Sequence, residues 1–548
     1  MNSKVDNPPP LFLIGWDGAT WDLLQPWMEA GHLPNLLRLV NRGVTSSVPS
    51  VPTINSGPAW TSIVTGVNPG RHGIFHLYND SGFCERRPMH SSDRCMPAIW
   101  TRLSMKGLPV CVVNVPVTYP ADPVCGVMIS GIDAPSVKSP GFTYPPNLIS
   151  EIGARIGRYE ISPEMYTVAR AGRLDTVLKL ILETLERRLQ TALHLVRTRP
   201  LRFLMVVFTE SDWAQHYLWP LPGRGEAVMS ERLRQVFERL DLALGQLWEA
   251  AGTEATLMLL SDHGFGPGHG GIVYLIPLLA KLGYQHFHHH AKEGRRLRHQ
   301  VRLWAMRYLS PSMLERLKHW FPALSSRFNP KMVLPATDWA TTSAYAQLER
   351  PEININLKGR QPFGTVEPEK YEGLREEIVQ VLSRVIEVES KRSVFQNVWR
   401  REEVYHGPEA NSGPDLILDF DDTSPTHGLR LGEITVSETY GGPFVATGGH
   451  RRNGILVATG PEIRCGAEIA GISLYDIAPT VMHLLDISVP EGLDGRVLME
   501  LLREESLGRH PVHYEPDPVP PGRTKPVNLD AEDEEAVRNR LRGLGYFE

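Results

Sequence analysis

The sequence predicts an α/β fold of three layers, in which a mostly parallel central sheet carries helices on both faces and inserted segments form a cap. Short apolar runs without polar alternation recur along the chain, as is typical of strands buried on both faces. Long stretches with helical periodicity separate several of these runs. Such alternation of strands and helices indicates a doubly wound sheet.

Several apolar runs are candidate strands, and most of them end in polar or acidic residues. They are LFLIGWDG (11–18), PVCVVNVP (109–116), FLMVVFTESD (203–212), TLMLLSDHG (256–264), DLILDFDD (415–422) and GILVATG (454–460). Residues 174–198 and 230–252 have a helical pattern. Ligands of open α/β sheets bind outside the carboxyl ends of the strands, where Asp17, Asp212, Asp262 and His263 fall.

The composition is that of a globular protein. Of 548 residues, 42% are hydrophobic and 22% charged, which excludes disordered, collagen-like and coiled-coil classes. The net charge of −5 argues against a generic nucleic-acid binder, so no specific nucleic-acid partner is expected. Five scattered cysteines form no CxxC pair, no signal peptide is evident, and no apolar run reaches the roughly 18 residues that span a bilayer. We therefore expect a soluble cytoplasmic protein.

The candidate ligands for metal ions are carboxylates and imidazoles spread over most of the chain. They are Asp17, Asp212, His216, Asp262, His263 and His450. The i, i+4 spacing of Asp212 and His216 would place both on one face of a helix, and glycines beside His450 would let its backbone approach a site closely. Three carboxylates and three imidazoles suit two Zn²⁺-like ions, with Mn²⁺ or Fe²⁺ as alternatives.

Ligands that range from residue 17 to residue 450 imply a single catalytic unit, which we expect to comprise residues 10–274 and 337–500. A basic, helical segment at 275–336 is expected to be an inserted cap. Its alternative role, contact with an anionic membrane surface, is less favoured. Residues 501–548 are expected to form a C-terminal extension with a linker and a charged helix.

Several motifs together resemble one enzyme superfamily. They are GWDGATWD, VPTINSGPAWTSIVTGVNPGRHGIF (51–75), ESDWAQH, LLSDHGFG and GGHRRNGIL. This set resembles the alkaline phosphatase superfamily, in particular its type I phosphodiesterase/nucleotide pyrophosphatase branch and the prokaryotic phosphohydrolase/phosphomutase-like proteins. The similarity covers nearly the whole chain and implies an alkaline phosphatase-like fold.

The resemblance also implies roles for the residues of the site. Asp212, His216 and His450 would hold one divalent ion, and Asp17, Asp262 and His263 the other. Ser56 would be the nucleophile between them. The run SGPAWTSIV places Ser56 at a helix N-terminus, where backbone N–H groups favour an arriving phosphate. Thr53 is the rival hydroxyl, for which a loop role is favoured.

Two departures from the family pattern bear on the substrate. Ser56 is followed by Gly57, Pro58, Ala59 and Trp60, so the arginine that a sulfatase needs is missing. Nucleotide pyrophosphatases usually carry an asparagine at the position of Ala59, so nucleotide specificity is in doubt unless Asn55 or backbone N–H groups substitute. Asn55, Lys358 and Arg360 are the candidate contacts to substrate.

The predicted function is that of a metal-dependent hydrolase of small phosphoesters acting through a phosphorylated or nucleotidylated serine, with a diester favoured. A phosphomonoesterase or a phosphomutase of the same superfamily is the alternative, and a non-enzymatic binding protein is disfavoured by the complete set of site residues. The sequence leaves the organic part of the substrate and the oligomeric state open.

Overall fold

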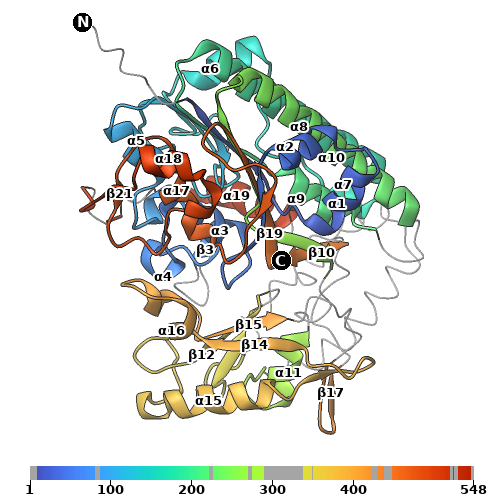
Figure 1. Ribbon diagram of the computed structural model, residues 1–548. Coiled ribbons are helices and arrows are strands. Elements are labelled where there is room, and N and C mark those ends of the chain that lie inside the picture. The colour runs from blue at the N-terminus through green and yellow to red at the C-terminus, as the bar shows by residue number, and fades with distance from the viewer. Residues whose placement is uncertain are drawn as a thin grey trace, which may run out of the picture.

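The computed structural model describes most of the chain. The described residues are 9–79, 87–220, 226–268, 274–288, 337–347, 350–420, 429–436, 447–518, 522–523, 527 and 529–544. They form a large lobe around one central sheet and, below it in Figure 1, a smaller body built from the described residues between 274 and 436, here called the small lobe.

Among the described residues, nine strands make up the central sheet, in the order β20-β2-β19-β9-β1-β8-β5-β6-β7. The core strands β9, β1, β8, β5 and β6 run parallel to one another. Their bounds and those of the other members are β1 (Leu11–Trp16), β2 (Val44–Pro49), β5 (Val110–Val115), β6 (Gly126–Ser130), β7 (Thr143–Tyr144), β8 (Phe203–Phe208), β9 (Thr256–Leu260), β19 (Asn453–Thr459) and β20 (Ala467–Glu468). The mostly parallel sheet predicted from the apolar runs is confirmed.

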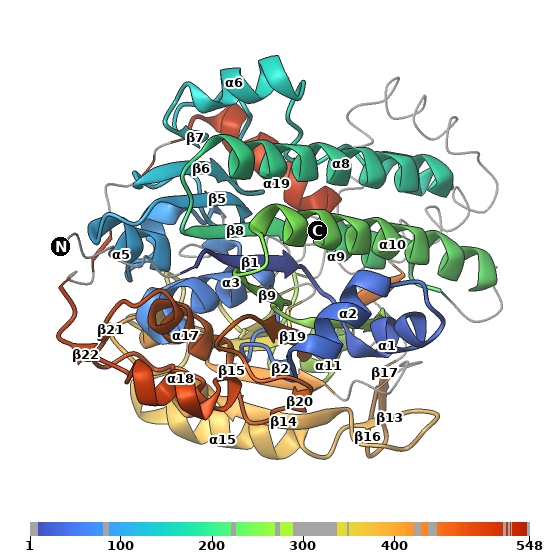
Figure 2. The same cartoon turned by 45° about the horizontal axis from the view of Figure 1, so that its top comes forward.

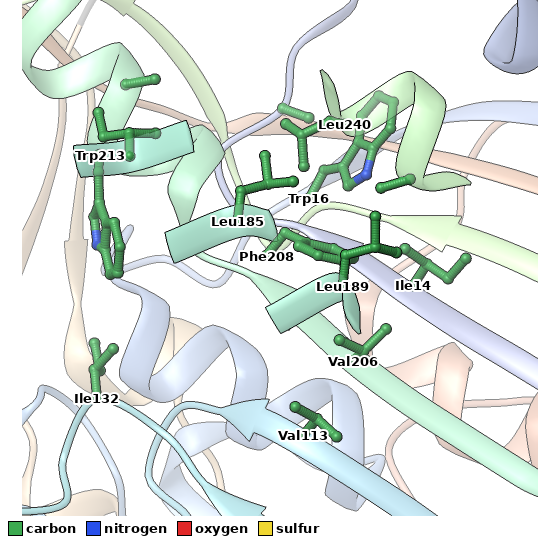
Figure 3. Close-up of a cluster of buried hydrophobic side chains, with 14 of the residues drawn as sticks. Ile14, Trp16, Val113, Ile132, Leu185, Leu189, Val206, Phe208, Trp213 and Leu240 are labelled. Carbon is green, nitrogen blue, oxygen red and sulfur yellow. The ribbon is translucent and has the colours of Figure 1, made fainter. Parts of the chain in front are cut away.

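Alternating residues of the central strands enter two different cores, which explains why the strands are apolar throughout. Phe12, Ile14 and Trp16 of β1 face one core, whereas Leu11 and Leu13 face the other. Figure 3 shows Ile14, Trp16, Val206 and Phe208 within the first core. Side chains that point to opposite faces of a strand must both be apolar when helices cover both faces.

Helices cover the two faces of the sheet, as Figure 2 shows. Those on the first face are α1 (Trp21–Glu29), α2 (Pro34–Arg42), α6 (Leu148–Arg155), α7 (Tyr166–Arg170), α8 (Leu174–Thr198), α9 (Glu210–Leu218), α10 (Glu226–Ala251) and α19 (Ala531–Gly543). Those on the second face include α3 (Ser56–Thr65), α5 (Ile99–Met105) and α17 (Ile477–Leu484). The predicted three-layer arrangement is confirmed.

Two of the candidate strands do not join the central sheet as parallel strands. The run at 454–460 forms β19, which is inserted antiparallel between β2 and β9. The run at 415–422 forms β15 (Leu416–Phe420), which belongs to a separate antiparallel sheet in the small lobe. Apolar content identifies a buried strand, but it contains no information on strand direction or on which sheet the strand joins.

The small lobe has its own hydrophobic core, in which Leu279, Ile353, Ile378 and Leu416 are buried. One sheet of the lobe has the order β11-β12-β15-β14, and another has the order β13-β16-β17. The bounds are α11 (Leu275–Lys281), β11 (Ala344–Ala346), β12 (Glu352–Ile355), α15 (Tyr371–Leu382), β13 (Ile386–Glu387), β14 (Phe395–Arg400), α16 (Arg401–Val404), β16 (Leu429–Leu431) and β17 (Ile434–Val436). Most of the predicted insertion at 275–336 lies outside the described residues, so a basic helical cap and its boundaries stay a prediction.

Shorter elements complete the large lobe. They are β3 (Tyr78–Asn79), β4 (Arg87–Pro88), α4 (Pro69–His72), β10 (Gly264–Pro267), β18 (Gly448–Arg451), β21 (Val489–Pro490), α18 (Glu504–Arg509) and β22 (Tyr514–Glu515). The charged run near the C-terminus forms α19, whose Val537 and Leu541 are buried in the first core of the large lobe. Within the described parts of the chain, no helix is both long and apolar enough to cross a bilayer.

Candidate active site

The site lies where the carboxyl ends of three adjacent parallel strands meet. β1 is paired with β8 on one side and β9 on the other, with Trp16 opposite Phe208 and Gly15 opposite Leu260, so the three strands end within one residue of each other. Asp17 follows β1, Asp212 lies in the first turn of α9 just after β8, and Asp262 follows β9. All three carboxylates are fully buried. The structure therefore brings together residues that are separated by up to 245 positions because their strands end at the same edge.

Two imidazoles and one carboxylate form the first group of candidate metal ligands. His216 Nε2 lies 3.4 Å from Asp212 Oδ1, and His450 Nε2 lies 3.2 Å from the same oxygen. The two Nε2 atoms are 3.1 Å apart. α9 supplies Asp212 and His216 one turn apart, as the spacing predicted, whereas His450 comes from β18.

The second group surrounds Ser56. His263 Nε2 lies 3.5 Å from Asp17 Oδ1 and 3.5 Å from Asp262 Oδ2. Ser56 Oγ lies 3.3 Å from Asp17 Oδ1 and 3.2 Å from His263 Nε2. His263 Nδ1 lies 2.9 Å from the carbonyl oxygen of Gly264. A carbonyl can only accept, so Nδ1 carries the proton and the lone pair of Nε2 faces Ser56.

A short ribbon of β10 and β18 joins the two groups. Phe265 and His450 are partners in this antiparallel pair. The ring of His450 stacks on that of His263 with centroids 3.9 Å apart, and Phe265 contacts the ring of His216 edge-on at 4.8 Å. The ribbon thus fixes the imidazoles by packing against an apolar ring.

Ser56 is the first residue of α3, and Asn55 caps this helix. Asn55 Oδ1 accepts a hydrogen bond from the N–H of Gly57 at 3.1 Å. The N-terminus of a helix presents backbone N–H groups and a positive dipole end, and both favour a phosphate. Ser56 therefore lies between the candidate ligands and a region suited to an anion.

Burial and repulsion between carboxylates oppose ionisation of two of the three aspartates of the site. Burial, followed by the charges of Asp262 and Asp212, raises the pKa of Asp17 well above its ordinary value. Burial also raises the pKa of Asp262 to about 7. Burial opposes ionisation of Asp212 as well, but the imidazoles of His216 and His450 outweigh it and lower the pKa of this carboxyl. Burial and the neighbouring His263 lower the pKa of His450 to about 3.

The donor atoms fit divalent metal ions. Nε2 lone pairs of neutral imidazoles that face each other and a carboxylate oxygen repel unless a cation or proton lies among them. Within the described residues, the groups Asp212–His216–His450 and Asp17–Asp212–His263 each place one ligand atom per residue within 4.8 Å of the others. Asp262 Oδ2 is buried and accepts no hydrogen bond from the described chain. Oxygen and nitrogen ligands without a thiolate suit Zn²⁺, Mn²⁺ or Fe²⁺.

Other side chains hold the ligands, and the sequence motifs did not single them out for this. Trp60 Nε1 donates to Asp17 Oδ2 at 3.1 Å, and Ser211 Oγ donates to the backbone carbonyl of Asp17 at 2.7 Å. Gln215 Nε2 donates to the carbonyl of Gly18 at 2.8 Å. Trp60 lies four residues after Ser56, so helical spacing is the signal that could have placed it on the same face.

The hydroxyl of Thr53, the alternative nucleophile, forms hydrogen bonds with residues outside the candidate ligand groups. Its Oγ1 lies 2.9 Å from Glu352 Oε1 and 2.7 Å from the hydroxyl of Tyr405. Glu352 Oε2 lies 2.8 Å from His76 Nε2. Thr53 therefore faces a buried carboxylate of the small lobe, whereas Ser56 faces the candidate metal ligands.

The two predicted substrate contacts in the small lobe have partners within the protein. Lys358 forms an ion pair with Glu367. Arg360 donates to the buried Asp415 at 2.7 Å and to the carbonyl of Ile355 at 2.8 Å. These contacts do not support a role in substrate binding, which stays a prediction. Of the three candidates, Asn55 is the one beside Ser56.

Comparison with known proteins places the chain in a family. The family model for type I phosphodiesterase/nucleotide pyrophosphatase matches residues 11–428. The fold is similar to that of human ectonucleotide pyrophosphatase/phosphodiesterase 5, with a TM-score of 0.51, 13% identity, and coverage of 90% of this chain and 100% of that chain. Phosphonoacetate hydrolase from Sinorhizobium meliloti, solved with phosphonoacetate, gives a TM-score of 0.50, 15% identity, and coverage of 86% and 94%.

A comparison of the sequence with curated proteins found no match. The two structural similarities establish the fold, and the family model extends over most of the chain, including all candidate ligands except His450. The chain therefore belongs to the type I phosphodiesterase/nucleotide pyrophosphatase family of the alkaline phosphatase superfamily, and is a phosphoric ester hydrolase.

Proposed function

We propose that this protein hydrolyses small phosphoesters, with diesters favoured, at a two-metal site in which Ser56 is the nucleophile. The observation that carries the proposal is the position of Ser56 Oγ, within 3.3 Å of Asp17 Oδ1 and His263 Nε2 and at the N-terminus of α3. A serine hydroxyl is a weak nucleophile unless its surroundings favour loss of its proton. Ser56 faces two acceptors, and this is the arrangement that such activation needs.

Asp212, His216 and His450 would hold one divalent ion, and Asp17, Asp262 and His263 the other. The bound ions would supply charge neutralisation and Lewis acidity to the phosphate oxygens. Zn²⁺ is our first choice because mixed imidazole and carboxylate ligands suit it. Asp212 belongs to both groups of neighbouring ligand atoms, which supports one continuous site.

The reaction we propose has two displacements at phosphorus. Ser56 Oγ forms a bond to phosphorus as the bond to the leaving alcohol breaks, and the alcohol takes up a proton. Water then attacks the same phosphorus, the serine ester bond breaks and Ser56 regains its proton. Backbone N–H groups of α3 and the side-chain amide of Asn55, held by its bond to Gly57, would bind the non-bridging oxygens. Asn55 would thereby take the role of the asparagine that Ala59 replaces.

A phosphomutase is the second candidate, and contact of the small lobe with the segment before Ser56 favours it. In a mutase, the phosphoryl group would return to another hydroxyl of the same molecule, which requires exclusion of water. Reaction in ¹⁸O-labelled water distinguishes the two. Label in the released phosphate supports hydrolysis, whereas an isomerised product without label would replace the proposal by the mutase.

We infer a cytoplasmic location from the cysteines. Cys95, Cys111, Cys125 and Cys465 are free thiols, and Cys84 lies outside the described residues. Free thiols are the common state in a reducing compartment.

The experiment that tests the proposal uses the full chain reconstituted with Zn²⁺, Mn²⁺ or Fe²⁺. An aryl phosphomonoester, an aryl phosphodiester and a nucleotide diester would be compared as substrates. Ser56→Ala is expected to lower kcat by about 10³-fold or more, because the variant lacks the hydroxyl that forms the proposed covalent ester. Ser62→Ala, further along α3 and bonded to His72 at 2.9 Å, is the matched control and should retain turnover. Full activity of Ser56→Ala would overturn the proposal.

A further inference from the structure

A buried polar network joins the small lobe to the segment that precedes Ser56. Its members are Thr53 and His76 of the large lobe and Glu352 and Tyr405 from the small-lobe range of the chain. Glu352, Thr53 and Tyr405 are at most 2% exposed, and His76 is 9% exposed. Residues of both lobes therefore share a buried polar contact.

The direction of each hydrogen bond in this network follows from its chemistry. A carboxylate only accepts, so Thr53 Oγ1–H donates to Glu352 Oε1 at 2.9 Å and His76 Nε2–H donates to Oε2 at 2.8 Å. Thr53 has one hydroxyl proton, so the Tyr405 hydroxyl is the donor in the 2.7 Å bond between them. Both oxygens of Glu352 are thus used, and the Thr53 hydroxyl has one allowed orientation.

Each of the three residues before Ser56 has a contact that restricts its position. Thr53 is bound by Glu352, the carbonyl of Ile54 lies 3.5 Å from His450 Nδ1, and Asn55 caps α3. Leu77, next to His76, packs on Gly57, where an added Cβ would lie 3.0 Å from Leu77 Cδ2. The network thus fixes the strand-to-helix turn on which Ser56 stands.

Burial of Glu352 has a cost that the network must offset. Burial opposes ionisation of this carboxyl, but His76, followed by the charge of Arg350 and the hydrogen bond from Thr53, outweighs it and holds its pKa below the ordinary value. A buried carboxylate with two directed donors is strongly oriented because hydrogen bonds to charged groups are about twice as strong as neutral ones. Since Glu352 is the first residue of β12, the small-lobe sheet determines its position.

We propose that Glu352 is a positioning residue for Ser56, acting through the hydroxyl of Thr53, so that the small lobe sets the geometry of the nucleophile. This inference rests on the proposed function of Ser56. An error of about 1 Å in the placement of a reacting group can cost up to 10²-fold in rate. The small lobe is then a part of the catalytic machinery in addition to any role in binding substrate.

The test is a double-variant cycle measured with the zinc-reconstituted full chain and an aryl phosphodiester. Thr53→Val keeps the shape and removes the hydroxyl, and Glu352→Gln keeps the shape and removes the charge. Each is expected to lower kcat about 10-fold or more with KM and bound zinc per chain nearly unchanged. The double variant should be no slower than the slower single variant, because both changes break the same link.

Two further variants separate positioning from general destabilisation. Thr53→Ser restores the hydroxyl and should recover most of the lost kcat. Glu387→Gln alters another buried glutamate of the small lobe, which accepts from the N–H of Glu389 at 2.9 Å, and should lower the melting temperature without lowering kcat at a temperature where the protein is folded.

The outcomes distinguish this inference from the proposed function. If Ser56→Ala is inactive but Thr53→Val and Glu352→Gln turn over at the normal rate, or slow the reaction additively, the positioning role is wrong and the nucleophile stands. If Ser56→Ala is active, the proposed function fails first. If Thr53→Val is inactive and Thr53→Ser and Ser56→Ala are both active, Thr53 itself would be the nucleophile, and both proposals fail.

Discussion

Glu210 and Asp212 lie two residues apart on α9 and are both fully buried, yet their surroundings differ. Glu210 forms an ion pair with Arg188, which is itself 1% exposed and also donates to Thr209 and to the carbonyl of Ile161. Asp212 faces His216, His450 and the carboxylates of the second ligand group. Arg188 is a permanent cation beside Glu210, whereas His216 and His450 beside Asp212 are charged only when protonated.

We expect this difference to distinguish a structural ion pair from a metal-ligand site. A buried charge is tolerated when the chain supplies its counter-charge, as Arg188 does for Glu210. The three aspartates of the site lie beside imidazoles, and we expect divalent ions to supply their counter-charge. The predictions below test this contrast, from the largest expected effect to the smallest.

Arg188→Met should lower the free energy of unfolding by about 3–5 kcal/mol, because it leaves Glu210 buried without a counter-charge. Denaturant unfolding measures this. Arg188→Met combined with Glu210→Gln should recover most of the loss. If the single variant were as stable as the wild type, Glu210 would not depend on Arg188, and the contrast with Asp212 would fail.

Removal of metal should destabilise the protein. A ligand at about 100 to 1,000 times its Kd stabilises the folded state by about 2.7–4.1 kcal/mol, so a chelator should lower the free energy of unfolding by this order. Thermal unfolding with and without Zn²⁺ measures the change, and a His450→Ala variant should show a smaller one. No change in the wild-type protein would mean that the aspartate cluster is stable without a cation.

Asp262→Asn should stabilise the metal-free protein at pH 8 by about 1–2 kcal/mol, because burial and the charge of Asp212 oppose ionisation of Asp262 and the amide cannot ionise. The same change should abolish most of the stabilisation by metal. Asp241→Asn is the matched control. Asp241 is a buried aspartate whose oxygens accept from the N–H groups of Asn35 and Leu36, so its amide variant should be less stable. If Asp262→Asn and Asp241→Asn destabilised the protein equally, Asp262 would behave as an ordinary hydrogen-bonded aspartate and not as a member of a ligand cluster.

His72 represents a third case, a buried group that stays neutral. The N–H of Ile74 donates to its Nδ1 at 3.1 Å, so Nε2 carries the proton and donates to Ser62. Burial, with a smaller contribution from Arg94, lowers the pKa of His72 to about 3. The unfolded state therefore binds a proton between about pH 6.5 and 3 that the folded state does not, and stability falls as the pH falls through this window.

The variant His72→Asn should make this pH dependence shallower. Between about pH 4 and 6, the slope of unfolding free energy against pH should decrease by about 1 kcal/mol per pH unit relative to the wild type. Denaturant unfolding at several pH values gives both slopes. If the wild type and His72→Asn had equal slopes, His72 would not remain neutral in the folded state over this pH range.

The sequence was informative where local pattern determines position. Asp17, Asp212 and Asp262 could be expected in one place because strands that are buried on both faces are recognisable and their carboxyl ends coincide in a parallel sheet. Helical spacing correctly placed His216 beside Asp212. The nucleophile, the assignment of ligands to two ions and the role of Asn55 are still predictions that the activity measurements must decide.

The remaining features depend on pairing between distant segments, for which a single sequence has no local signal. Nothing in the run at 454–460 specifies an antiparallel place between β2 and β9, and the run at 415–422 does not specify the small-lobe sheet. Glu352 is separated from Thr53 by 299 residues, and no pattern near either residue indicates their contact. Likewise, nothing in the sequence indicates that Arg360 donates to Asp415, 55 residues away, and its predicted role as a substrate contact is untested.

The place of β19 in the sheet also has a consequence for biosynthesis. The edge of β9 that pairs with β19 is made on the ribosome well before its partner, which follows about 190 residues later along the chain. At a rate of synthesis of roughly 5–20 residues per second, β19 is completed about 10–40 s after this edge of β9. His450 arrives in the same late segment, so a nascent chain cannot complete the first ligand group until the sheet is ready to close.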